Sequence, residues 1–427
     1  RPIQLAVVKE SDVIETIDMV YRRRNEITSL AEELHDELSD TDIDLATLVD
    51  NEDVANAPVV KLLQSIFEDA VQIGASDIHI EPDETVLRIR QRIDGVLQEQ
   101  VMKERKIAPA LVSRLKLMSG LNISEKRVPQ DGRFNIRVHG RSVDVRLSTM
   151  PIQAGESVVM RLLDQSGGTL NLEQLGMSNH TLRRFRANIT RPFGMVLVTG
   201  PTGSGKTTTL YSALSELNEA EKKIITVEDP VEYRLPRINQ VQVNPKVGLP
   251  FASVLRAALR QDPDIVLVGE MRDQETAEIG LRAAMTGHMV LSTLHTNDSI
   301  STVNRLLDMG AQGYLVASAL RAVVAQRLVR KICDSCKTEH TPDARELVII
   351  KNLMGDAHAS VTFQHGTGCT HCNNTGYHGR IGVFEFLEID DQLADDRRRS
   401  DASGFAGHAK QSDSCHSFAQ HALEYAL

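Results

Sequence analysis

The sequence predicts an α/β protein of two or three domains, and three observations carry this prediction. The chain has 427 residues, which exceeds the usual size of a domain built around a single hydrophobic core. Residues 58–164 contain runs in which apolar and polar residues alternate, and residues 175–330 contain short apolar runs between helical patterns. A glycine-rich loop, residues 200–205, stands between one apolar run and a helical pattern. We therefore expect a small α/β domain followed by a parallel sheet that helices cover on both faces.

Composition and charge narrow the class of protein. Hydrophobic residues make up 41% of the chain and charged residues 25%, as in ordinary globular domains. No apolar run approaches the roughly 18 residues that a membrane-spanning helix needs. The net charge of −10, the aromatic content of 4% and the absence of Trp disfavour general binding to nucleic acid. The start of the chain shows no secretory signal pattern. Because the chain begins at Arg1 rather than Met, we expect a fragment of a longer protein.

Shifts in composition divide the chain into five predicted segments. They are an acidic helical segment and linker (1–57), a first α/β domain (58–168), a second α/β domain (169–330), a segment with two cysteine pairs (331–385) and a polar helical tail (386–427). The first domain ends in Gln165-Ser-Gly-Gly168, which has the composition of a flexible hinge.

Local patterns predict the elements of the two α/β domains. Residues 59–73 have apolar residues at helical spacing and end at Gly74, a residue typical of the position after a helix. Asp94-Gly95 predicts a turn and His139-Gly140 a two-residue hairpin. The predicted strands are 77–80, 85–93, 133–138, 141–148 and 157–163 in the first domain, and 195–199, 224–227, 265–268 and 289–293 in the second.

The most specific motif is Gly200-Pro-Thr-Gly-Ser-Gly-Lys-Thr207, which fits the phosphate-binding loop G-x-x-x-x-G-K-[ST]. Backbone N–H groups of such a loop point at phosphate oxygens, and the helix that follows adds positive potential. We expect Lys206 to hold the β- and γ-phosphates of ATP and Thr207 to bind Mg²⁺. The candidate ATP and Mg²⁺ residues of this loop are Gly200, Pro201, Thr202, Gly203, Ser204, Gly205, Lys206, Thr207 and Thr208.

Other strand ends carry polar groups that parallel strands bring to the same edge of the sheet. Glu270 is suited to orient or deprotonate the attacking water, or to hold Mg²⁺ through a water. Glu228, Asp229 and Glu232 follow a second strand, where paired carboxylates suit Mg²⁺–water coordination. His295 follows a third strand and could sense a γ-phosphate. The alternative is an ordinary strand-end residue, and it weighs most for His295.

Four arginines are candidates for stabilising the charge of the transferred phosphate. Arg146 and Arg161 lie in the first domain, whereas Arg256 and Arg260 lie in a helical pattern before the strand of Glu270. For each of them, a salt bridge or a solvated side chain is an equally good interpretation.

Two Cys-x-x-Cys pairs predict a structural zinc site. Cys333/Cys336 and Cys369/Cys372 can supply four thiolates in a tetrahedron, which leaves no open coordination position. Free thiols or a lost metal are the alternatives. Cys415 has no partner in this pattern.

With these motifs in this order, residues 58–387 resemble the bacterial ATPase family of type II secretion and type IV pilus assembly. The motifs correspond to the family's Walker A loop (200–209), Asp box (226–232), Walker B strand (260–270) and His box (292–297). The resemblance implies a RecA-like P-loop ATPase domain, preceded by a smaller PAS-like α+β domain and followed by a small tetracysteine zinc subdomain. It also implies ATP bound between the two domains, Glu270 as the catalytic acid, and the four arginines as nucleotide-facing or cross-domain residues.

Within the family, the chain is most similar to the mannose-sensitive haemagglutinin (MSHA) pilus assembly ATPases, truncated at the N-terminus. Tyr21-Arg-Arg-Arg24 and residues 29–33 carry this similarity, and other type IV pilus or type II secretion members remain alternatives. Relatives of the MSHA type bind cyclic di-GMP through an N-terminal domain whose sequence elements are not in this chain. Met271 and the tail from Gln392 depart from the family pattern.

The resemblance implies a cytoplasmic motor that forms a homo-hexamer and lies at the inner membrane through its partners, among them a platform protein. ATP hydrolysis would change the angle between the two domains about the 165–168 hinge. The acidic charge argues against the main alternative, a RecA-like nucleic-acid translocase, so we expect no nucleic-acid partner. A third possibility is a ring that binds ATP with negligible turnover.

Overall fold

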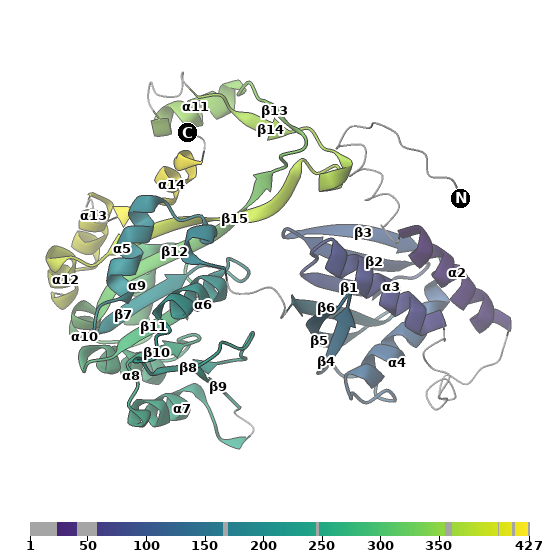
Figure 1. Ribbon diagram of the computed structural model, residues 1–427, viewed down its shortest axis with the longest axis horizontal. Helices are drawn as coiled ribbons and strands as arrows, with labels where there is room; N and C mark the ends of the chain where they lie inside the picture. Colours follow the sequence, from purple (N-terminus) through teal and green to yellow (C-terminus); the bar gives the residue numbers. More distant parts are fainter. Residues whose placement is uncertain are drawn as a thin grey trace. The chain divides into compact units, whose positions relative to one another are not determined.

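The structure, a computed structural model, describes residues 24–40, 58–164, 170–244, 247–354, 361–399, 401–411 and 415–425 (Figure 1). The chain forms two compact units. The first consists of Arg1–Gly168, Cys333–Cys336 and Thr367–His378, and the second of Thr169–Ile332, Lys337–Gly366 and Gly379–Leu427. The predicted hinge at 165–168 lies outside the described residues, as do 1–23 and 41–57 of the acidic segment.

The first unit contains a six-stranded antiparallel sheet with the order β3-β2-β1-β6-β5-β4. The residues at both predicted turns have positive φ, as the hairpin prediction requires (Asp94 48°, Gly95 85°, His139 46°, Gly140 79°). Strand β3 is not among the predicted strands, because its centre is polar and it forms an edge of the sheet. The strands are β1 (Asp77–Pro82), β2 (Leu87–Ile93), β3 (Val96–Met102), β4 (Gln130–Val138), β5 (Arg141–Ile152) and β6 (Gly155–Asp164).

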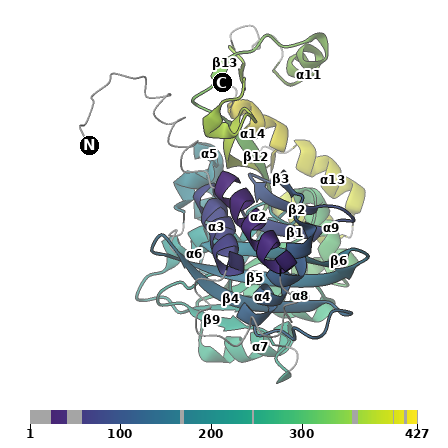
Figure 2. The ribbon, with the colours of Figure 1, turned by 90° about the vertical axis from the view of Figure 1, so that its right-hand side faces the viewer.

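Three helices form one core with one face of this sheet. They are α2 (Arg24–Asp40), α3 (Pro58–Gln72) and α4 (Ala108–Met118), and Figure 2 shows α2 and α3 side by side. Apolar residues at helical spacing on α3, such as Leu62 and Ile66, are fully buried against inward residues of the strands, such as Ile78 and Ile80. Because side chains alternate along each strand, the opposite face carries the polar residues.

The second unit is built on an eight-stranded sheet with the order β16-β15-β12-β7-β11-β10-β8-β9. The pairs that join β12, β7, β11, β10, β8 and β9 are all parallel, whereas β15 and β16 are antiparallel. The strands are β7 (Gly194–Thr199), β8 (Ile224–Glu228), β9 (Asn239–Gln242), β10 (Ile265–Val268), β11 (Met289–Leu294), β12 (Leu320–Ile332), β15 (Tyr377–Glu388) and β16 (Cys415–His416).

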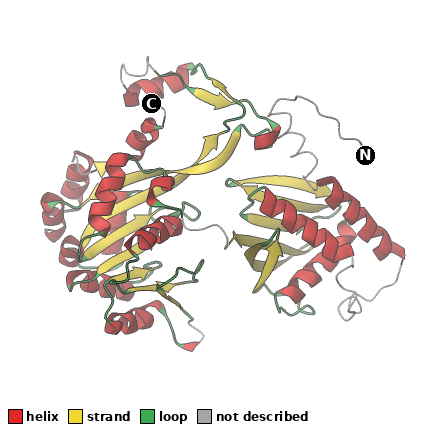
Figure 3. Ribbon diagram, viewed as in Figure 1, coloured by secondary structure: helices red, strands yellow, loops and turns green. Residues whose placement is uncertain are grey.

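Helices cover both faces of this sheet, as predicted (Figure 3). On one face, α5 (Asn179–Ile189) and α6 (Lys206–Leu217) pack on alternate residues of the strands, such as Val196 and Val198. The intervening residues, such as Leu197, pack on the helices of the other face. Those helices are α7 (Phe251–Ala258), α8 (Gln274–Met285), α9 (Ser299–Asp308), α10 (Gly313–Ala319), α12 (Asp391–Arg398) and α13 (Ala402–Gln411).

The structure divides the last hundred residues differently from the predicted segments 331–385 and 386–427. β15 crosses the predicted boundary, because Phe384, Phe386 and Leu387 are all buried in the cores of the second unit. The tail is therefore not purely helical. The remaining elements are β13 (Lys337–Glu339), α11 (Ala344–Met354), β14 (Gln364–Gly366) and α14 (Phe418–Glu424). Among the described residues, no helix combines the length and the apolar character needed to cross a membrane.

Candidate nucleotide-binding site

The glycine-rich loop connects the end of β7 to the start of α6, as its motif requires. Gly200 has φ +148° and Gly205 has φ +87°, conformations that other residues rarely adopt. A β-carbon at Gly200 would lie 2.5 Å from the carbonyl oxygen of Gln326, so the loop has no room for a side chain there. The backbone can curl as a phosphate-binding loop does because these two positions are glycines.

Lys206, at the first position of α6, folds back over this loop. Its Nζ donates hydrogen bonds to the carbonyl oxygens of Gly200 at 2.8 Å and Pro201 at 3.0 Å. Burial lowers the pKa of Lys206; with the opposing effect of Glu270 and a smaller lowering by Arg327, the pKa is about 8. The ammonium is therefore protonated at neutral pH but close to titrating.

We expect the affinity for ATP to fall as the pH rises through 8. Bound phosphates favour the charged form of Lys206, so binding above its free-protein pKa requires uptake of a proton. The dissociation constant of a non-hydrolysable ATP analogue should be nearly constant below pH 7 and about tenfold higher at pH 9 than at pH 7. Titration calorimetry in a pH series measures this change. The same slope in a Lys206→Arg variant, whose guanidinium stays protonated, would show that another group is responsible.

Glu270 lies just beyond β10 with two basic side chains around it. Its Oε1 accepts a hydrogen bond from Arg272 Nη2 at 2.6 Å, and its Oε2 lies 3.7 Å from His295 Nε2. Burial, together with Lys206, lowers the pKa of His295, while Glu270 opposes the change. The structure thus brings together Glu270 and His295 at one edge of the sheet, as predicted. Arg272 is an addition that the motifs did not single out.

Glu228, which the sequence analysis assigned to Mg²⁺–water coordination, is buried, with only 3% of its surface exposed. Its carboxylate accepts hydrogen bonds from the hydroxyls of Tyr211 and Thr226 and from Gln240 Nε2. Burial raises the pKa of Glu228. Since these donors occupy its oxygens, the geometry favours Glu270 over Glu228 as the group that contacts the attacking water.

The other candidates of this unit lie near its surface. Asp229 is exposed, and its carboxylate is 3.9 Å from Arg272 Nη1. Arg256 pairs with Glu275 of α8, and Arg260 Nη1 donates to the carbonyl of Arg256 at 3.0 Å. Arg256 thus makes the salt bridge of the alternative interpretation, whereas the hydrogen bond of Arg260 goes to a backbone carbonyl. Glu232 is half-buried, and its N–H donates to the hydroxyl of Tyr211 at 3.3 Å.

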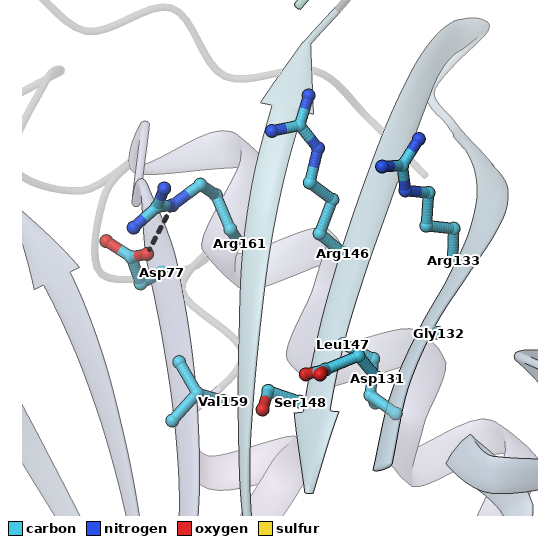
Figure 4. Close-up of a pocket in the computed structure, with 9 residues that line it drawn as sticks. All are labelled: Asp77, Asp131, Gly132, Arg133, Arg146, Leu147, Ser148, Val159 and Arg161. Carbon is cyan, nitrogen blue, oxygen red and sulfur yellow. Dashed lines mark hydrogen bonds and ion pairs between the residues drawn. The ribbon is translucent and has the colours of Figure 1, made fainter. Parts of the chain in front are cut away.

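Arg146 and Arg161 lie in the first unit, on the face of its sheet opposite the three helices. Arg133, Arg146 and Arg161 are direct neighbours across β4, β5 and β6, and Asp77 of β1 follows in the same row. Figure 4 shows the side chains of Arg133 and Arg146 extending in the same direction, whereas that of Arg161 turns toward Asp77. All three arginines line a pocket of about 460 Å³, where Arg161 Nε donates to Asp77 Oδ1 at 3.2 Å. A row of three guanidinium groups is suited to bind an anion.

Arg133 is a candidate that the sequence analysis did not include, although the sequence contained the signal. The hairpin turn at His139-Gly140 pairs Val138 with Arg141, and counting back five residues on one strand and forward five on the other pairs Arg133 with Arg146. The predicted turn therefore already placed Arg133 beside Arg146.

The four paired cysteines converge, and their Sγ atoms all lie within 4.8 Å of one another. The Cys333–Cys369 and Cys336–Cys372 Sγ distances are 3.8 Å, and the Cys369–Cys372 distance is 3.7 Å. Four sulfurs at about 2.3 Å from a tetrahedral Zn²⁺ are about 3.8 Å apart. The donor set and its spacing therefore fit this metal. Backbone N–H groups of Cys369 and Gly376 both donate to Cys372 Sγ at 3.2 Å, as thiolate ligands require.

Comparison with known proteins decides the family. The model of the type II/IV secretion system protein family matches residues 52–424. The chain belongs to this family. It is 47% identical over 395 residues to the type II secretion system ATPase E of Vibrio cholerae, covering 91% of this chain and 78% of that protein. It is 46% identical over 394 residues to the type IV pilus assembly ATPase PilB of Myxococcus xanthus, covering 92% and 70%.

A further sequence relative and two solved structures are also similar to this chain. Type II secretion system protein E of Dickeya dadantii is 52% identical over 360 residues, which cover 84% of this chain and 70% of that protein. Among solved structures, the pilus retraction motor PilT with bound ADP has a TM-score of 0.56 and 27% identity, with 82% and 90% coverage. The Legionella pneumophila ATPase DotB, at 22% identity and a TM-score of 0.61, shares the fold, with 86% and 92% coverage. The predicted family and its ATPase class are confirmed, whereas the MSHA assignment stays a prediction.

Proposed function

We propose that this chain is a cytoplasmic motor subunit that hydrolyses ATP at the 200–207 loop and drives type II secretion or type IV pilus assembly. The observation that carries the proposal is the cluster at the loop: Lys206, Glu270 and His295 lie at one edge of the sheet. A phosphate-holding cation and a carboxylate that can orient and deprotonate the attacking water are groups that ATP hydrolysis uses.

The residues of this site would divide the work as follows. The loop N–H groups and Lys206 would hold the phosphates, and Thr207, in the first turn of α6, would bind a Mg²⁺ ion that neutralises the phosphate charge. Glu270 orients and deprotonates the water. The Arg272–Glu270 ion pair holds the carboxylate in one position, which fixes its orientation before substrate arrives.

The assembly belongs to the same proposal. The second unit would be the RecA-like domain and the first the PAS-like domain of a homo-hexamer that an inner-membrane platform protein binds. The row of Arg133, Arg146 and Arg161 would supply positive charge to the triphosphate, in the same or a neighbouring subunit. The four cysteines would hold a structural Zn²⁺.

The experiment that tests the function is steady-state ATP hydrolysis by the purified chain at several protein concentrations, since ring assembly should raise the rate per chain. We expect Mg²⁺-dependent turnover that Lys206→Ala abolishes and that DNA and RNA leave unchanged. Stimulation by nucleic acid would instead support the translocase alternative. A single turnover followed by no further hydrolysis would support the nucleotide-gated ring.

A cellular test is needed to choose between secretion and pilus assembly. The chain is 47% and 52% identical to two secretion relatives and 46% identical to a pilus relative, so sequence identity does not separate the two pathways. Deletion of the gene should abolish either surface pili or the release of secreted proteins. The pilus phenotype would favour the MSHA type, and the secretion phenotype would exclude it.

A further inference from the structure

Strand β12 carries two polar side chains that reach the phosphate loop from outside its motif. β12 lies parallel to β7, so Gln326 and Arg327 come beside the loop that begins at Gly200. Gln326 is only 2% exposed, and its Oε1 accepts a hydrogen bond from Thr209 Oγ1 on α6 at 2.7 Å. Its carbonyl oxygen packs directly on Gly200. Gln326 therefore contacts both the loop and the helix that follows it.

Arg327 contacts two other parts of the second unit. Its Nη1 donates to the carbonyl of Gln326 at 3.0 Å, and its Nη2 donates to the carbonyl of Asn297 at 2.7 Å, two residues after His295. The guanidinium lies 5.3 Å from the ring centre of Phe418, the first residue of α14. Arg327 thus links the loop of His295 to the C-terminal helix, while its neighbour Gln326 contacts the phosphate loop.

Helix α14 also has anchors at its other end, and these do not involve Arg327. The hydroxyl of Tyr425 lies 2.5 Å from the carbonyl oxygen of Gly176 and 2.8 Å from that of Gly382. The N–H of Phe384 donates to Nδ1 of the buried His421 at 3.0 Å. The contact between Phe418 and Arg327 can therefore be removed while these anchors stay in place.

We propose that Arg327 binds the phosphates of the nucleotide, and that α14, through Phe418, sets the position of its guanidinium. The proposal rests on the proposed ATP site. Among the described residues, the hydrogen bonds of Arg327 go to neutral oxygens, and a phosphate oxygen is a stronger acceptor for a guanidinium than any of these. Its neighbour Gln326 packs on Gly200, so Arg327 lies beside the phosphate loop, and its charge helps to lower the pKa of Lys206. Binding of ATP and docking of α14 are then coupled, and the coupling is reciprocal.

The test is the dissociation constant of a Mg²⁺-bound, non-hydrolysable ATP analogue, measured by calorimetry on the whole chain. Arg327→Lys keeps the charge but loses the guanidinium fork, and we expect about tenfold weaker binding. Phe418→Leu removes the ring beneath the guanidinium, and we expect about threefold weaker binding. Ala422→Ser is the control at an exposed position of the same helix, and its dissociation constant should stay within about twofold of the parental value.

Lys206→Ala separates this inference from the proposed function. If the parental chain binds the analogue, Lys206→Ala does not, and both Arg327→Lys and Phe418→Leu bind normally, the inference is wrong and the ATP site stands. If the parental chain does not bind it, both fail. A second measurement covers variants that fold poorly: hydrogen exchange of residues 418–424 in the parental chain should slow on analogue binding, and unchanged exchange overturns the coupling.

Discussion

Replacing Glu270 with Gln is expected to lower the kcat of ATP hydrolysis by about 10²- to 10⁴-fold. The amide has the size of the carboxylate but cannot accept a proton from the attacking water. Its oxygen can still accept the hydrogen bond from Arg272, so the surrounding geometry should persist. The dissociation constant of the ATP analogue should therefore change little, which identifies a loss in the chemical step and not in binding.

The chain offers a matched control for this substitution. Glu219, just after α6, has a side chain that is 61% exposed and pairs only with Lys222 in the described contacts, so Glu219→Gln makes the same chemical change away from the loop. Its kcat should equal the parental value. If Glu270→Gln hydrolyses ATP at the parental rate, Glu270 is not the catalytic carboxylate. Glu228 would then be the next candidate, and its hydrogen bond from the Tyr211 hydroxyl would have to break before it could contact the water.

The sequence predicted the parts of this site that lie within contiguous motifs. The loop at 200–207 needs only glycines, a lysine and a flanking strand and helix, all of which are local. Glu270 and His295 could also be placed, because the carboxyl ends of parallel strands meet at one edge of a sheet. The depth of each side chain was not predictable in this way: Glu228 is buried at the end of β8, where Tyr211, 17 positions earlier, donates a hydrogen bond to it.

The contacts that escaped prediction join segments far apart in the chain. Thr209 meets Gln326 across 117 positions, and Arg327 meets Asn297 across 30. They depend on β12 lying next to β7, a strand order that apolar patterns alone do not specify. Edge strands are hard to predict for a related reason: β3 has no buried face long enough to impose alternation on its sequence.

Removal of one zinc ligand should produce the second large effect. We expect the parental chain to retain about one equivalent of zinc after dialysis, and Cys369→Ser to retain less than about a tenth. Three remaining sulfurs cannot complete the tetrahedron that the 3.7–3.8 Å spacing fits. Because structural zinc contributes about 10–16 kcal/mol to the folding of small sites, the segment around residues 367–378 should also become sensitive to protease.

Cys415→Ser is the control, since it makes the same substitution outside the cluster and should leave the metal content and protease resistance unchanged. Elemental analysis of dialysed protein, followed by limited proteolysis, measures both quantities. Less than about half an equivalent of zinc in the parental chain would reject the metal site, because a ligand set with this affinity does not lose its ion on dialysis. Full zinc in Cys369→Ser would show that another residue completes the tetrahedron, and His371, whose Nδ1 lies 3.6 Å from Cys333 Sγ, is the residue placed to do so.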